Sequence, residues 1–132
     1  MKIVVDTSVI ICVILNEPHK ANIIKATKGA VLLSPASLHW EIGNAFSAMF
    51  KQNRITMKEV KQALHYYEQI PIRYCGISLE KSLEIATVLK IYAYDAYFIA
   101  CAKSFNAPLI SLDKVLLNNA NSYNIQTIEV VR

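Results

Sequence analysis

Short apolar runs alternate with longer amphipathic segments along the chain. The runs at residues 2–5, 30–34 and 108–111 are almost entirely apolar, which is typical of strands buried on both faces of a parallel sheet. Two further extended segments are predicted at residues 72–77 and 125–131. Strands that alternate with helices predict an α/β fold, in which right-handed crossovers cover both faces of a parallel sheet.

The predicted helices begin and end at residues with known capping preferences. Thr56 and Glu59 form a T-x-x-E capping box, and Gly29 is a typical helix-ending residue. In the helix that follows the second strand, the apolar residues recur at helical spacing. Helices are expected at residues 7–15, 18–29, from Pro35, from Thr56 to before Pro71, at 78–90, from Asp95 to about Ser104, and after Asp113.

Composition limits the class of protein. The chain has 132 residues, of which 54% are hydrophobic and 18% charged, and this favours one folded domain over residues 1–132. Its three cysteines are far apart and form no CxxC pair, so we expect reduced core thiols in a cytoplasmic protein. Only three apolar residues precede Asp6 after Lys2, and no apolar run approaches membrane-spanning length. We therefore expect neither a signal peptide nor a membrane partner.

Four acidic residues fall where an open α/β sheet places its ligands, in the crevice beyond the carboxyl ends of the strands. Asp6 follows the first strand, and Asp113 follows the strand at 108–111. Asp95 opens a predicted helix, and Glu41 lies at the margin of the apolar face of another. Four separate segments thus each bring one carboxylate to an element junction or an apolar face.

Each of these acids also has a simpler interpretation. Asp6 and Asp113 suit helix N-caps, Asp95 suits an N-cap or a first turn, and Glu41 suits the solvated edge of a helix. The other six acids stand in polar surroundings, whereas all three aspartates stand beside apolar runs. For each residue alone both interpretations stay open, but together the four favour a shared site.

A shared site would require a cation. Two carboxylates about 4 Å apart repel each other by about 4 kcal/mol at an effective dielectric constant near 20. Oxygen ligands without histidine or cysteine suit Mg²⁺ or Mn²⁺. His19, His39 and His65 lack ligand spacing, and we expect them at the surface or an interface. Such a metal site would serve phosphodiester chemistry.

The distribution of charge is compatible with a nucleic-acid partner. The net charge is +4, and once the four candidate ligands are set aside, 14 basic and 6 acidic residues leave +8. Four basic residues, Lys51, Arg54, Lys58 and Lys61, lie within eleven positions and could hold an RNA backbone beside the acids. The alternative for this cluster is an ordinary solvated pair of helices.

Five segments together resemble one known family. They are VVDTSVIICVILNEP, LLSPASLHWEIGNAF with its E-x-x-N at Glu41 and Asn44, NRITMKEVKQAL, YAYDAYFIACA and LISLDKVL. In this order and over nearly the whole chain, they resemble the PIN-domain ribonucleases, most closely the VapC-type toxins of prokaryotic toxin–antitoxin systems. Each segment alone is a weak signal, and the case rests on their order and the full domain length.

The resemblance implies a small three-layer α/β/α sandwich. It implies that Asp6, Glu41, Asp95 and Asp113 bind Mg²⁺ or Mn²⁺ for the hydrolysis of RNA, and that the protein dimerises and is silenced by an antitoxin. Thr7 or Ser8 would bind a carboxylate or the substrate phosphate, and Asn44 would orient Glu41. Ser111 keeps the hydroxyl of the family's commoner threonine. The additional acid of some relatives is absent, because residues 114–117 are KVLL, which argues against tight binding of a second metal.

Smaller questions stay open at this stage. Tyr92, Tyr94 and Tyr97 either line the site or a dimer interface, or pack with solvated hydroxyls. A phosphatase or receiver domain is disfavoured, because Ser8 stands where the phosphatase has a second aspartate and PLISLD carries no lysine. The other alternative is a PIN-like module that binds RNA or a partner without cleavage.

Overall fold

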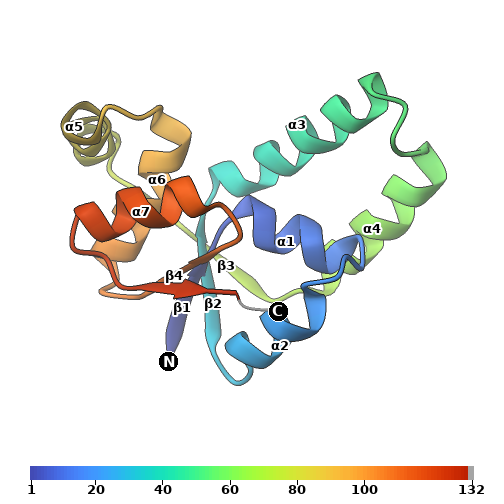
Figure 1. The fold of residues 1–132 in the computed structure, drawn as a ribbon, viewed down its shortest axis with the longest axis horizontal. Helices are drawn as coiled ribbons and strands as arrows, with labels where there is room; N and C mark the ends of the chain where they lie inside the picture. Colours follow the sequence, from blue (N-terminus) through green and yellow to red (C-terminus); the bar gives the residue numbers. More distant parts are fainter. Residues whose placement is uncertain (131–132) are drawn as a thin grey trace.

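A five-stranded, fully parallel sheet forms the centre of the fold, in the order β3-β2-β1-β4-β5 (Figure 1). The computed structural model describes residues 1–130. Ile3, Val4 and Val5 of the middle strand are almost completely buried, as expected for a strand covered on both faces. The strands are β1 (Lys2–Val5), β2 (Val31–Pro35), β3 (Ile72–Cys75), β4 (Leu109–Ser111) and β5 (Thr127–Glu129). The predicted parallel α/β fold is confirmed.

Seven helices connect these strands within the described residues. They are α1 (Thr7–Ile14), α2 (Lys20–Thr27), α3 (Ser37–Lys51), α4 (Met57–Gln69), α5 (Leu79–Leu89), α6 (Ala93–Ser104) and α7 (Lys114–Ser122). In Figure 1, α3 and α4 form a hairpin that extends away from the sheet. Among residues 1–130 no single helix is long and apolar enough to cross a membrane. Helices α5 and α6 would be long and apolar enough only if taken together, and they meet at a bend of 113°.

The strand order creates a crevice between β1 and β4. The chain steps from β1 through β2 to β3 in one direction, whereas β4 and β5 lie on the other side of β1. Right-handed crossovers therefore place α1 to α4 on one face of the sheet and α5 to α7 on the other, as Figure 1 shows. The helices after β1 and β4 leave toward opposite faces, which is the arrangement that opens a ligand crevice in α/β sheets.

The ends of several elements differ from the prediction. The helix expected from residue 18 begins at Lys20. At its other end Gly29 has a φ of 76°, the left-handed conformation that is typical of a helix-ending glycine. The helix expected from Pro35 begins at Ser37, because Pro35 is still paired in β2. The last strand, expected over 125–131, is limited to Thr127–Glu129, and Val131 lies outside the described residues.

Two further expectations are corrected by the structure. Asp95 does not open its helix, because the N-cap of α6 is Tyr92 and Asp95 lies in the first turn. Of the three free cysteines, Cys12 and Cys101 are buried as expected, but Cys75 is only partly buried, since it ends the edge strand β3.

We predict that the capping box of α4 contributes measurably to stability. Thr56 Oγ1 accepts a hydrogen bond from the Glu59 N–H at 3.2 Å, and Glu59 Oε1 accepts one from the Thr56 N–H at 3.1 Å. Thr56→Ala should lower the free energy of unfolding by about 1 kcal/mol, as measured by urea denaturation. Thr87→Ala, at an exposed residue in the last turn of α5, is the control. An equal loss in both variants would contradict a specific role for the cap.

Candidate active site at the carboxyl edge of the sheet

Asp6, the first residue after β1, is the best-anchored of the candidate acids. Its side chain is only 5% exposed. Oδ1 accepts hydrogen bonds from Ser8 Oγ at 2.7 Å and from the Val9 N–H at 3.1 Å, and Oδ2 accepts one from Ser111 Oγ at 2.6 Å. The expected role as N-cap of α1 is therefore present, but Asp6 does more than cap, because a serine from a distant strand also holds it.

The two serines tie the β1–α1 junction to the β4–α7 junction. Ser8 Oγ accepts the Leu112 N–H at 3.0 Å, and Ser111 Oγ accepts the Asp113 N–H at 2.9 Å. Each hydroxyl therefore donates to Asp6 and accepts from the backbone after β4. The position of Asp6 and the path of the chain into α7 are thus fixed by one hydrogen-bond network.

Asp113 and Asp95 lie at the N-terminal ends of two helices. Asp113 is an exposed N-cap, whose Oδ1 accepts the Val115 N–H at 2.9 Å and the Leu116 N–H at 3.2 Å. Asp95 is half-buried in the first turn of α6, and within the described part of the chain its carboxylate makes no hydrogen bond. Both carboxylates therefore lie near the positive end of a helix dipole.

Glu41 lies on α3 among polar atoms that lack partners. Its Oε2 is buried without a hydrogen bond in residues 1–130, and the same is true of Thr7 Oγ1 and Ser37 Oγ. Ser37 was not predicted as a site residue; it precedes Glu41 by four positions on the same helix, and this spacing is the signal that could have found it. Asn44 is exposed one turn after Glu41 on the same helix, and its expected role in orienting Glu41 stays a prediction.

Burial and mutual repulsion raise the pKa of three of the four carboxyl groups. Burial raises the pKa of Asp6 to about 6, although the hydrogen bonds from Ser111, Ser8 and Val9 act in the opposite direction. Burial likewise raises the pKa of Glu41 to about 7, against the effect of the nearby Ser37 and Thr7 hydroxyls. The pKa of Asp95 is raised by burial and then by the charge of Asp113.

Electrostatic contacts connect all four acids. The charge of Asp113 acts on both Asp6 and Asp95, and the charges of Asp95 and Asp6 act on Glu41. In the described chain, however, no three histidine, cysteine, aspartate or glutamate side chains are close enough together to hold a metal ion. The four acids therefore influence one another electrostatically, but no three of them are close enough in the described residues to ligate one ion.

The chemistry of this set fits a hard divalent cation. The donors are carboxylate and hydroxyl oxygens, which suit Mg²⁺ or Mn²⁺. Buried polar atoms normally have partners. Within residues 1–130, buried oxygens of Thr7, Ser37 and Glu41 have none at hydrogen-bond geometry, although the two hydroxyls are close enough to lower the pKa of Glu41. This group of oxygens marks a place for a polar occupant. A cation would also relieve the repulsion that raises the pKa values.

The predicted basic cluster lies apart from the acids. Lys51, Arg54, Lys58 and Lys61 are all exposed near the tip of the α3–α4 hairpin. Lys51 follows Glu41 by ten residues on one helix, which corresponds to roughly 15 Å. These residues do not form a rim directly around the carboxylates. Lys114, which was not predicted as a site residue, follows Asp113 directly.

The tyrosines of α6 differ in environment. Tyr92 and Tyr94 are 89% and 54% exposed, whereas Tyr97 is half-buried and meets Tyr94 edge to face at 6.0 Å between ring centroids. Tyr92 and Tyr94 are therefore available to a partner, while Tyr97 contributes mainly to packing.

Several solved structures share this fold. PAE2754 from Pyrobaculum aerophilum matches with a TM-score of 0.74 and 21% identity, over 98% of this chain and 92% of that one. VapBC2 from Rickettsia felis, bound to a DNA fragment from its promoter, matches with a TM-score of 0.70 and 14% identity, over 98% of each chain. VapBC-1 from nontypeable Haemophilus influenzae matches with a TM-score of 0.68 and 19% identity, over the whole of both chains.

Comparison at the level of sequence gives the family. No curated protein matches this chain. The family model of the PIN domain, however, matches residues 3–121, which include all four candidate acids and every strand except β5. The chain therefore belongs to the PIN domain family.

Proposed function

We propose that this protein is an Mg²⁺- or Mn²⁺-dependent endoribonuclease and the toxin of a type II toxin–antitoxin pair. PIN domains are generally nucleases, so hydrolysis of a nucleic acid is the starting point. The observation that carries the proposal is the set of four carboxylates at the carboxyl edge of the sheet, each within electrostatic reach of another. Such a set is suited to a cation and to a phosphodiester beside it.

Each carboxylate would have a defined part. Asp6, Glu41, Asp95 and Asp113 would hold the cation, which supplies charge neutralisation and activation of a water molecule when bound. Ser8 and Ser111 keep Asp6 in place by donating to its two oxygens. Thr7 and Ser37 lie beside Glu41 and lower its pKa, and either hydroxyl could donate to a phosphate oxygen.

The choice of RNA as the substrate and of an antitoxin as the partner rests on weaker support. The solved VapBC structures from R. felis and H. influenzae have the same fold, but they are less than 25% identical to this chain. The basic α3–α4 tip would contact an RNA backbone at a distance from the cleavage point. Exposed Lys51 and Arg54 there would contribute to the affinity for RNA more than to the rate of cleavage.

We predict that purified protein cleaves a mixed-sequence, partly single-stranded RNA when Mg²⁺ or Mn²⁺ is added, and that EDTA stops the cleavage. Asp95→Asn should lower the rate at least a hundredfold, because it removes one proposed ligand charge while retaining the side-chain shape. Glu80→Gln, exposed in the first turn of α5, is the matched control and should cleave normally.

Two results would contradict this proposal. Full cleavage in EDTA would exclude the metal-dependent mechanism, and normal cleavage by Asp95→Asn would exclude that residue from the site. Metal binding without cleavage of any RNA would favour the alternative, a PIN-like module that binds RNA or a partner.

We predict that metal-free protein loses stability as the pH rises from about 4 to 7. Asp6 and Glu41 bind protons more tightly in the folded protein than in the unfolded chain, so folding is favoured when they are protonated. For buried Asp6, ionisation costs roughly 3 kcal/mol of stability, because burial raises its pKa to about 6.

Added Mn²⁺ should therefore raise the melting temperature more at pH 7.5 than at pH 5, when measured by calorimetry. Glu41→Gln should reduce both the loss of stability in EDTA and the response to Mn²⁺, whereas Glu84→Gln on the surface of α5 should change neither. A pH-independent stability in EDTA, or equal stabilisation by Mn²⁺ at both pH values, would contradict the site.

We also propose that α5 contributes to a homodimer. Leu79 and Leu83 are 59% and 48% exposed and lie one turn apart on the same face of this helix. Exposed apolar side chains grouped in this way indicate a surface that another chain covers. Sedimentation velocity should show a dimer that Leu83→Lys converts to monomer, while Met57→Lys, at an exposed apolar residue of α4, does not. A monomeric wild type would contradict the assignment.

A further inference from the structure

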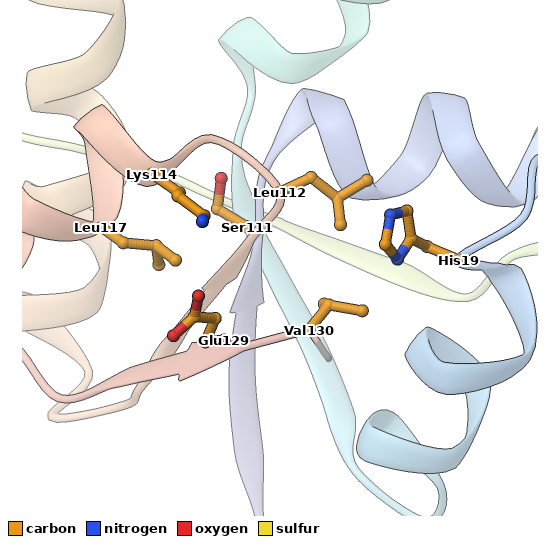
Figure 2. Close-up of a pocket in the computed structure, with 7 residues that line it drawn as sticks. All are labelled: His19, Ser111, Leu112, Lys114, Leu117, Glu129 and Val130. Atoms are coloured by element: carbon orange, nitrogen blue, oxygen red, sulfur yellow. The ribbon is translucent and has the colours of Figure 1, made fainter. Parts of the chain in front are cut away.

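A cavity of about 430 Å³ opens beside the candidate active site (Figure 2). Its size is typical of pockets that hold small organic groups. Ser111 belongs to both places, because it lines the cavity and its hydroxyl donates to Asp6 at 2.6 Å. The lining comes from the start of α2, the β4–α7 junction, α7 and β5, and consists of His19, Ser111, Leu112, Lys114, Leu117, Glu129 and Val130.

Polar groups stand at the two ends of this cavity, with aliphatic side chains between them. Figure 2 shows the ammonium group of Lys114 and the carboxylate of Glu129 at one end, and the imidazole of His19 at the other. Leu112 and Val130 lie between these ends. A flat ring could pack against the aliphatic side chains while its polar edges meet the groups at the ends.

His19 is poised to donate a hydrogen bond. Its Nδ1 is buried and has no partner among the described residues. A proton on that nitrogen would be a buried, unpaired donor, so the neutral ring favours the tautomer with its proton on Nε2. Nε2 then offers an N–H to an occupant of the cavity.

We propose that this cavity binds the base of the nucleotide next to the phosphodiester that is cleaved. The proposal rests on the ribonuclease function proposed above and assigns it a subsite. Because Ser111 binds Asp6 and also lines the cavity, a base held there would be close to the carboxylates. Lys114 directly follows Asp113 and adds a positive charge for an RNA phosphate near the cavity.

Glu129 gives the subsite a preference among the four bases. A carboxylate only accepts hydrogen bonds, and its two oxygens pair best with two neighbouring donors. Unpaired RNA bases are read on their Watson–Crick edges, where guanine alone presents two adjacent groups with N–H donors, N1 and N2. The subsite should therefore prefer guanine over adenine, cytosine and uracil.

The test is a titration of the four nucleoside 5′-monophosphates, without added metal, followed by amide chemical shifts in NMR spectra. Guanosine monophosphate should shift the amides of His19, Leu112 and Val130 and should bind most tightly. Glu129→Gln should weaken that binding about tenfold and remove the preference, because the amide can accept at only one atom. Glu84→Gln, on the surface of α5, is the matched control and should bind like the wild type.

His19→Ala provides an independent variant that leaves Glu129 in place. It should weaken all four nucleotides to a similar extent, since it removes a donor that does not distinguish guanine. The unperturbed spectrum of each variant away from the cavity shows that it is folded. Shifts confined to other surfaces, equal binding of the four nucleotides, or an unchanged preference in Glu129→Gln would overturn the assignment.

Failure of the subsite and failure of the ribonuclease proposal give different results. If guanosine monophosphate binds as expected but no RNA is cleaved with Mg²⁺ or Mn²⁺, the cavity is a nucleotide site and the catalytic proposal is wrong. If RNA is cleaved but no nucleotide shifts the cavity amides, and Glu129→Gln leaves the cleavage pattern unchanged, the subsite is wrong and the catalytic proposal stands.

Discussion

The site depends on the burial of one carboxylate, that of Asp6, at the end of the central strand. A buried carboxylate is unfavourable unless hydrogen bonds compensate for the lost water, and Ser8, Val9 and Ser111 supply them. Two of these donors also bind the backbone after β4. The hydrogen bonds that stabilise the Asp6 carboxylate therefore also hold the ends of β1 and β4 together.

The other carboxylates are held by their own local structure. Asp113 caps α7, Asp95 lies in the first turn of α6, and Glu41 lies four residues after Ser37 on α3. Backbone N–H groups hold Asp113, whereas Asp95 is placed by its position in the first turn of α6. At Asp113 the N-cap role and the proposed ligand role are compatible, because both cap hydrogen bonds go to Oδ1 and Oδ2 could bind a cation.

Much of this arrangement follows from the sequence, for identifiable reasons. Strands covered on both faces are continuous apolar runs, and the acids that follow them mark the carboxyl edge of the sheet. The start of α3 was misplaced because Pro35, a common first helical residue, remains in β2.

Features that depend on strand order could not be predicted. The sequence gives no direct sign that β4 lies between β1 and β5, so neither the Ser111–Asp6 hydrogen bond nor the cavity between α2 and β5 was expected. The distance of the basic cluster from the acids follows from the length of the α3–α4 hairpin. The sequence predicts the basic cluster beside the acids, because spacing along the chain does not show that α3 extends away from the sheet.

The central claim is that the four separate carboxylates form one cation site. The most direct measurement is anomalous diffraction from crystals grown with Mn²⁺. The account predicts one strong peak in the crevice, with oxygens of Asp6 and at least one other of the four acids about 2.1 Å away. A structure with Mn²⁺ bound elsewhere, or with no peak in this crevice at millimolar Mn²⁺, would contradict it.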